Sequence, residues 1–122
     1  MHVSRREQIQ DVIHTPTGER IYELIGSPEA AGGAAQHSLA EVVVPPGKSS
    51  EPHYHQTAEE TYYLLQGAAR MVIEGEEFGL EAGQACLIEP GEVHQIFNEG
   101  EDDLVFLAVC APPWTAGDSF PA

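Results

Sequence analysis

The 122-residue sequence is poor in positive charge. It has five Lys and Arg residues against 20 Asp and Glu residues, and its formal net charge is −15 at pH 7. A surface of that sign repels the phosphates of nucleic acids and the headgroups of anionic lipids. We therefore expect neither a nucleic-acid partner nor a membrane-surface role. The same charge concentrates cations near the protein, which suits a metal-binding function.

Cysteines and long apolar runs are also scarce. Cys86 and Cys110 are the only cysteines, and both lie in apolar segments, so we expect two buried, reduced thiols and no disulfide scaffold. No segment approaches the roughly 20 apolar residues that span a bilayer. The segment from Met1 to Asp11 is polar and charged, without the apolar core of a secretory signal. These features predict a cytoplasmic protein.

Short strands are the dominant pattern in the rest of the sequence. Apolar residues make up 42% of the chain, which is typical of one globular domain of this length. Turn sequences rich in Gly and Pro separate short segments of β-branched, aromatic and alternating residues, at 40–44, 61–66, 71–74, 85–88, 93–98 and 104–110. This spacing predicts an all-β, antiparallel sandwich or barrel in a single domain.

The two ends of the chain are expected to differ from this core. The segment from Ser4 to Ile13 suits either a short helix or an extended arm, and the small residues from Ala30 to Gln36 suggest a loop. The tail after residue 110 contains two consecutive prolines, which donate no hydrogen bond and so cannot continue a central strand. We divide the chain into an N-terminal arm with the first strands (1–37), a metal-binding barrel core (38–110) and a C-terminal tail (111–122).

Three histidines and a glutamate form the most informative pattern. His53 and His55 are two residues apart in a strand-like segment, so both imidazoles point to the same face. Glu60 follows five residues later, and His94 comes from a distant strand after a Pro-Gly turn. Three neutral imidazoles and one carboxylate suit Fe²⁺, Mn²⁺, Co²⁺, Ni²⁺ or Zn²⁺. We predict that these four residues hold one divalent ion and leave about two positions open for water, substrate or dioxygen.

The spacing of these residues resembles that of the cupin superfamily. Its first motif, Gly-x5-His-x-His-x4-Glu-x6-Gly, is matched at every position by Gly47, His53, His55, Glu60 and Gly67. Its second motif, Gly-x5-Pro-x-Gly-x2-His-x3-Asn, is matched by Gly83, Gly91, His94 and Asn98. Glu89 stands where the family has proline, and the neighbouring proline is Pro90. The resemblance implies a cupin-like, jelly-roll-type β-barrel with a metal in its mouth.

Several other side chains have two interpretations from the sequence. Glu59 is the rival of Glu60, but strand alternation turns neighbours to opposite faces, so we expect Glu59 to be solvated. Tyr62 and Leu64 share the parity of Glu60 and are expected to face the cavity, with packing as their ordinary role. Arg70 could bind an anionic substrate or lie on the outer surface. Trp114 could pack the C-terminal tail on the barrel or stack on a ligand. Asn98 could form a hydrogen bond near His94 or cap the turn that follows.

The resemblance implies a small-molecule function without naming the substrate. Cupins include dioxygenases, decarboxylases, isomerases, lyases, cyclases and non-enzymatic sensors. Our first hypothesis is an oxygen-dependent, dioxygenase-like oxidoreductase, with an apolar cavity lined by residues such as Leu64 and Ile96. The alternatives are a metal-dependent isomerase, lyase or decarboxylase, and a domain that binds or senses a small molecule. We also expect a homodimer, to which the segments 12–13 and 21–25 add strands.

Overall fold

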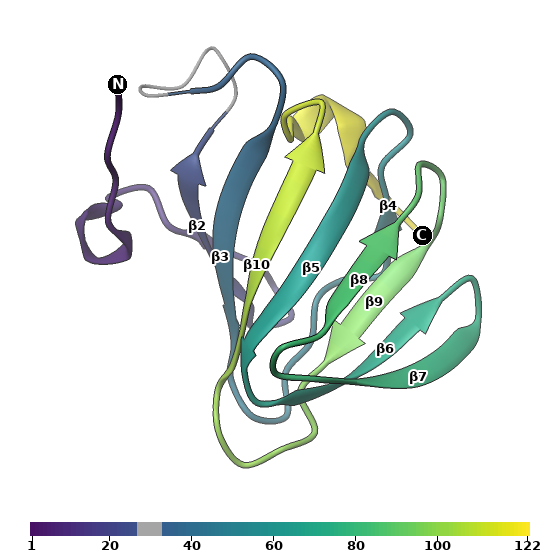
Figure 1. Cartoon of the computed structure of the whole chain (residues 1–122). Coiled ribbons are helices and arrows are strands. Elements are labelled where there is room, and N and C mark those ends of the chain that lie inside the picture. Colours follow the sequence, from purple (N-terminus) through teal and green to yellow (C-terminus); the bar gives the residue numbers. More distant parts are fainter. Residues whose placement is uncertain (27–32) are drawn as a thin grey trace.

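A computed structural model describes residues 1–26 and 33–122. Two antiparallel sheets face each other and curve around a common interior (Figure 1). The larger sheet contains, in spatial order, β1 (Ile13–His14), β2 (Arg20–Ile25), β3 (Ser38–Val44), β10 (Leu104–Ala111), β5 (Glu59–Gln66) and β8 (Ala85–Ile88). The smaller sheet contains β11 (Phe120–Pro121), β4 (His53–Tyr54), β9 (His94–Phe97), β6 (Ala68–Ile73) and β7 (Glu76–Glu81). The predicted all-β, antiparallel barrel architecture is confirmed.

Alternation along the central strands builds the core. On β5, residues 60, 62 and 64 are buried, while residues 59, 63 and 65 are exposed. Strand β10 alternates in the same way, with Leu104 and Phe106 almost fully buried between the sheets. The apolar core cluster draws on both sheets and comprises Val42, Val44, Tyr62, Leu64, Ala69, Met71, Leu80, Cys86, Ile88, Ile96, Leu104, Phe106 and Ala108. Burial of this shared apolar surface holds the two sheets together.

Tight turns connect the strands at the positions of the motif glycines. Gly47, Gly67, Gly83 and Gly91 all have positive φ angles, a conformation that costs little only for glycine. At Gly67 the space is also restricted, because an added Cβ would lie 3.2 Å from the backbone oxygen of Asp103. The glycines of the two motifs therefore shape the turns between strands, as the sequence predicted.

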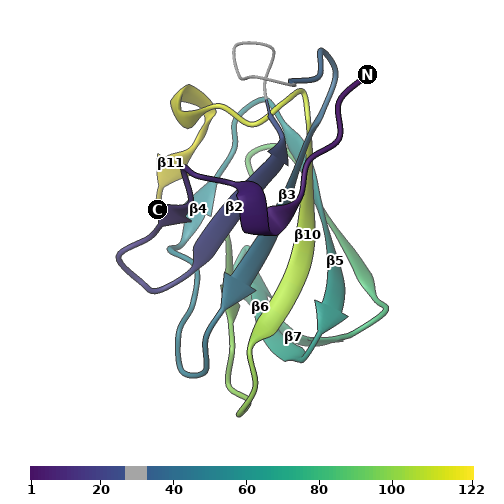
Figure 2. The ribbon, with the colours of Figure 1, turned by 90° about the vertical axis from the view of Figure 1, so that its left-hand side faces the viewer.

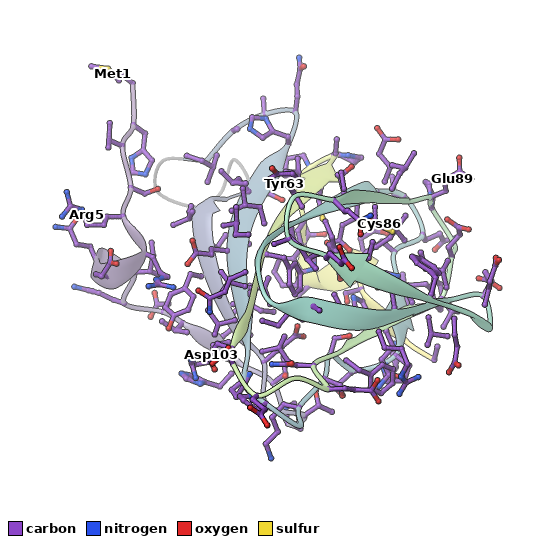
Figure 3. The ribbon with its side chains drawn as sticks, turned by 60° about the horizontal axis from the view of Figure 1, so that its bottom comes forward. Met1, Arg5, Tyr63, Cys86, Glu89 and Asp103 are labelled. Atoms are coloured by element: carbon purple, nitrogen blue, oxygen red, sulfur yellow. The ribbon has the colours of Figure 1, made fainter. Side chains whose placement is uncertain are left out.

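The N-terminal arm contains both of the structures that the sequence suggested for it. A 3₁₀ helix, η1 (Arg6–Gln8), lies outside β2 and β3 (Figure 2), where Arg6 forms a 2.7 Å ion pair with Glu41. Met1 and Arg5 project away from the sheets (Figure 3). The chain then enters β1 and β2, and β2 pairs with β3 of the same chain. Of the loop expected over 30–36, residues 30–32 lie outside the described residues, and 33–36 have no regular structure.

The C-terminal tail crosses to the smaller sheet. After β10 it forms a 3₁₀ helix, η2 (Ala116–Asp118), and then β11, which pairs with β4 beside the metal-ligand candidates (Figure 2). Its prolines keep it out of a central strand, as expected, although Pro121 pairs with His53 at the edge. The sequence missed this edge strand and also missed β7, in which five of six residues are exposed and three are charged. The strand β11 has only two residues, and the apolar alternation of β7 is limited to Phe78 and Leu80, which gives strand prediction little to detect.

Candidate metal centre

The fold brings together the four residues that the sequence predicted as metal ligands. His53 on β4 is paired in register with His94 on β9, His55 follows β4 directly, and Glu60 comes from β5 in the opposite sheet. The four ligand atoms all lie within 4.8 Å of one another. The Oε1 atom of Glu60 is 3.3 Å from Nε2 of His55 and 3.2 Å from Nε2 of His94. Ligand atoms about 2 Å from one shared ion would have separations of about 3 to 4 Å.

Hydrogen bonds to backbone carbonyls fix the orientation of all three imidazoles. Nδ1 of His53 lies 2.7 Å from the oxygen of Glu51, Nδ1 of His55 3.0 Å from that of Asp118, and Nδ1 of His94 2.9 Å from that of Glu92. A carbonyl oxygen only accepts, so each Nδ1 must be the donor and each neutral ring carries its lone pair on Nε2. Carbonyl partners of this kind are typical of metal-binding histidines, whose second nitrogen they hold in the donor state.

The centre has buried polar atoms that no protein hydrogen bond satisfies. Nε2 of His55, Nε2 of His94 and Oε1 of Glu60 are all buried and lack a hydrogen-bond partner. In the neutral tautomers these atoms present lone pairs to one another, which is unfavourable unless a proton or a cation lies between them. The donor set therefore fits a divalent transition metal: three imidazole nitrogens and one carboxylate oxygen, with no thiolate.

The pKa values of the metal-free centre are shifted by burial and by the charges of neighbouring ligand candidates. Burial first, and then the nearby His94, lower the pKa of His53 from 6.5 to about 4. Burial opposes the charged form of His55 as well, but the carboxylate of Glu60, 3.3 Å from its Nε2, outweighs burial and raises the pKa of His55. Burial also works against ionised Glu60, yet His55 and His94 hold its pKa well below its usual range. Glu60 is thus a carboxylate at neutral pH.

Two further residues support the centre, and the sequence did not indicate either one. The Sγ of Cys110 donates a hydrogen bond of 3.0 Å to Oε2 of Glu60, the oxygen that does not face the histidines. The carboxylate of Asp118 accepts the backbone N–H groups of residues 56, 57 and 58 at 2.9 to 3.0 Å, and so fixes the link between His55 and Glu60. Asp118 is 60 to 62 residues away in sequence from the three N–H groups that it accepts, so no local pattern reveals the contact.

A cavity of about 70 Å³ adjoins the four ligand candidates, and three of them line it. A cavity of this volume has room for a few groups of the size of a water molecule. Its walls include Tyr62, as the sequence predicted, and Trp114, which also lines an outer cavity of about 350 Å³. Leu64 and Ile96, which we expected on the wall, lie in the core and do not line the cavity. Apolar surface comes instead from β1, β2, β3 and β10, through Ile13, Ile21, Ala40, Val42 and Ala108.

The remaining alternatives from the sequence are also resolved. Glu59 is exposed and points away from the ligands, whereas Glu60 is buried among them. Arg70 lies outside the cavity, where it forms ion pairs with Glu77 and Glu99 and stacks over a phenyl ring. Asn98 caps its turn, because its Oδ1 accepts the N–H of residue 100 and its Nδ2 donates to the carbonyls of residues 44 and 102.

The departure from the second motif has a local explanation. Glu89 lies in the outer loop before His94 (Figure 3), and its N–H donates a 2.7 Å hydrogen bond to the carboxylate of Glu92. A proline at position 89 would lack this N–H. The loop still delivers its ligand, because Gly91 bonds to the carbonyl of His55 and the carbonyl of Glu92 accepts from His94.

Comparison with known proteins identifies the family. Residues 40–110, which contain all four ligand candidates, match the model of the cupin domain. This protein is a cupin. An uncharacterized protein of Methanocaldococcus jannaschii is 37% identical over 86% of this chain and 82% of its own length.

In the part of the chain that the structure describes, no helix is long and apolar enough to cross a membrane.

Two solved structures with related names share the fold of this cupin. A predicted oxalate decarboxylase of Thermotoga maritima superimposes with a TM-score of 0.75 and 32% identity, covering 90% of this chain and 98% of its own. A structure described as an oxalate oxidase gives a TM-score of 0.69 at 26% identity, covering 79% of this chain and 52% of its own. The similarity thus extends to proteins named for oxidative and non-oxidative chemistry on one small molecule.

Proposed function

We propose that this cupin is a metal-dependent enzyme that acts on a small molecule bound at the metal. One observation carries the proposal: buried, unpartnered atoms of His55, Glu60 and His94 converge beside a cavity. A divalent ion there would supply Lewis acidity and, if it is Fe or Mn, redox chemistry with dioxygen. His53 is only half-buried, which leaves the cavity side of the centre accessible to a ligand.

The residues of the chain have distinct roles in this proposal. The three imidazoles and Glu60 hold the ion, and the single carboxylate leaves one positive charge on a divalent centre. Cys110 donates to the outer oxygen of Glu60 and keeps the other oxygen directed at the histidines. Tyr62 and the apolar walls exclude bulk water, which strengthens electrostatic interactions within the cavity.

Within this class, we infer an oxygen-dependent, dioxygenase-like oxidoreductase as the first candidate. The likeness to an oxalate oxidase supports it, as do the absence of a thiolate among the four ligand candidates and the apolar walls of the cavity. We further infer a cytoplasmic location, in line with the two free, buried cysteines.

Oxygen uptake tests this candidate. The metal-free protein is loaded separately with Fe²⁺, Mn²⁺, Ni²⁺ and Zn²⁺ and screened with diketones, flavonols, catechols and thiol acids. We expect oxygen consumption with a redox-active metal, its loss in Glu60→Gln, and its retention in the matched control Glu59→Gln. Turnover that is equal with Zn²⁺, or that continues without oxygen, would overturn the dioxygenase reading.

The second candidate is a metal-dependent decarboxylase, lyase or isomerase. The likeness to a predicted oxalate decarboxylase favours it, since such reactions use the ion as a Lewis acid on a carbonyl or carboxylate. Turnover in the same screen without oxygen would support this class. Tight binding of a ligand with no turnover under any metal would instead indicate a binding or sensing protein.

A further inference from the structure

A second buried carboxylate, Glu19, lies on the wall of the metal cavity. Glu19 precedes β2 in a turn whose backbone is fixed by Thr15: its N–H donates to Oγ1 of Thr15 at 3.1 Å, and its carbonyl accepts the N–H of Thr15 at 3.0 Å. Only 8% of the residue is exposed. Within the described part of the chain its carboxylate forms no hydrogen bond or ion pair, and nothing in the metal centre explains why it is there.

The position of Glu19 gives it access to a ligand. It lines both the inner cavity and the outer cavity, as do His53 and Trp114. A molecule that occupies both cavities would therefore contact this side chain. A buried carboxylate without a partner is unfavourable, so a ligand that offers a hydrogen-bond donor to Glu19 would gain an interaction that the protein alone does not satisfy.

The charges around the cavity are negative. Glu19, Glu23 and Glu60 line it, and no Lys or Arg does. All five cationic residues of the chain are described and lie elsewhere, with Arg6 and Arg70 already in ion pairs on the outer surface. Burial first, and then the charges of Glu60 and Glu51, raise the pKa of Glu19 to about 7. With a divalent ion bound, the charges of Glu19 and Glu60 together would balance it, so a dianionic ligand would bring an excess of negative charge into the cavity.

We propose that Glu19 is a ligand-contacting residue that selects an uncharged or cationic molecule with a hydroxyl or amine donor and disfavours dicarboxylates such as oxalate. This inference rests on the proposed function, because it requires a ligand that also reaches the metal. The oxygen end of the ligand occupies the inner cavity, its donor faces Glu19, and its remaining atoms extend into the outer cavity. The substrate thus differs in charge from the one named in the two structural neighbours.

A comparison of two probes on the Co²⁺-loaded protein tests the assignment. Catechol and oxalate both present two adjacent oxygens to a metal. Catechol is uncharged in solution and, when one hydroxyl releases its proton to solvent on binding the metal, keeps the other hydroxyl as a donor to Glu19, whereas oxalate is a dianion without a donor. Their dissociation constants are measured from changes in the visible spectrum of Co²⁺ at neutral pH. We expect catechol to bind more tightly than oxalate to the wild-type protein. In Glu19→Gln the preference should shift toward oxalate by about tenfold or more.

Controls separate this inference from the proposed function. Glu19→Asp keeps the charge and should keep the preference for catechol, and Glu76→Gln, on exposed β7, should match the wild type. Circular dichroism and Co²⁺ content verify that each variant is folded and loaded. An unchanged ratio in loaded Glu19→Gln, or no spectral response to either probe, would overturn the role of Glu19. Failure of the wild type to bind Co²⁺ would overturn the proposed function itself, and this inference with it.

Discussion

Removal of the Asp118 carboxylate should loosen the metal centre from a distance. In Asp118→Ala, the N–H groups of Gln56, Thr57 and Ala58 lose their common acceptor. One helix-capping side chain contributes about 1 kcal/mol to the free energy of unfolding. The carboxylate of Asp118 accepts three such hydrogen bonds, but it is close to solvent, which weakens each of them. We therefore expect the free energy of unfolding to fall by about 2 kcal/mol, which lowers the melting temperature by about 5 to 8 °C in a domain of this size.

The same variant should weaken metal binding, because the released segment joins His55 to Glu60. Loss of an outer partner of a metal ligand typically costs 10- to 100-fold in affinity, and we expect about tenfold here, measured by competition with a chromogenic chelator for Co²⁺. Asp118→Asn retains one acceptor oxygen and should give an intermediate result. Asp102→Ala is the control, since Asp102 is exposed and its backbone carbonyl forms the hydrogen bond. Wild-type affinity in folded Asp118→Ala would refute this reasoning.

Two effects of pH and one of surface chemistry follow from other parts of the structure. His53 takes up a proton near pH 6.5 in the unfolded chain but only near pH 4 in the folded, metal-free chain. The free energy of unfolding should therefore fall as the pH falls from 6.5 to 4, by at most about 3 kcal/mol. Urea unfolding of His53→Gln should show a smaller loss over the same range, and an equal loss would show that His53 is not the cause. NMR titration of metal-free protein should place the pKa of His55 above its ordinary value, and Glu60→Gln should lower it; no change would show that Glu60 is not the cause. We also expect a dimer. The segments 12–13 and 21–25, which we expected to add strands to a partner, contribute to β1 and β2, which pair with each other and with β3 in the same chain; Leu65 and Leu87 are exposed on neighbouring strands and offer another apolar surface. Light scattering should give twice the 13.2 kDa of one chain and a lower mass for the Leu65→Lys/Leu87→Lys variant, while a monomer at all concentrations would be contrary evidence.

The sequence predicted the parts of this protein that depend on local periodicity and spacing. Alternation on β5 distinguished Glu60 from Glu59, and the motif spacing placed His53 and His94 at one centre before the register of their strands was known. Long-range contacts were beyond such reasoning. Asp118 and Cys110 reach the centre only because the tail and β10 fold back onto it, and neither residue belongs to a motif.

The cavity itself was the least predictable feature. Strand parity correctly turned Leu64 and Ile96 inward, but parity does not distinguish a residue packed in the core from one that borders empty space. That difference depends on long-range packing: residues of β2, β3 and β10 line the cavity, whereas Leu64 and Ile96 lie within the core cluster. Glu19 lies in a turn before β2, in a segment with no strand-like alternation to indicate its direction.

The metal content of matched variants tests the central claim most directly. Each protein is stripped, reloaded with Co²⁺, desalted and analysed for cobalt per folded chain. We expect one ion per chain in the wild type and in Glu59→Ala, and little or none in His53→Ala, His55→Ala, Glu60→Ala and His94→Ala. A full complement of cobalt in His55→Ala or His94→Ala, or loss in Glu59→Ala with retention in Glu60→Ala, would contradict the metal centre described above.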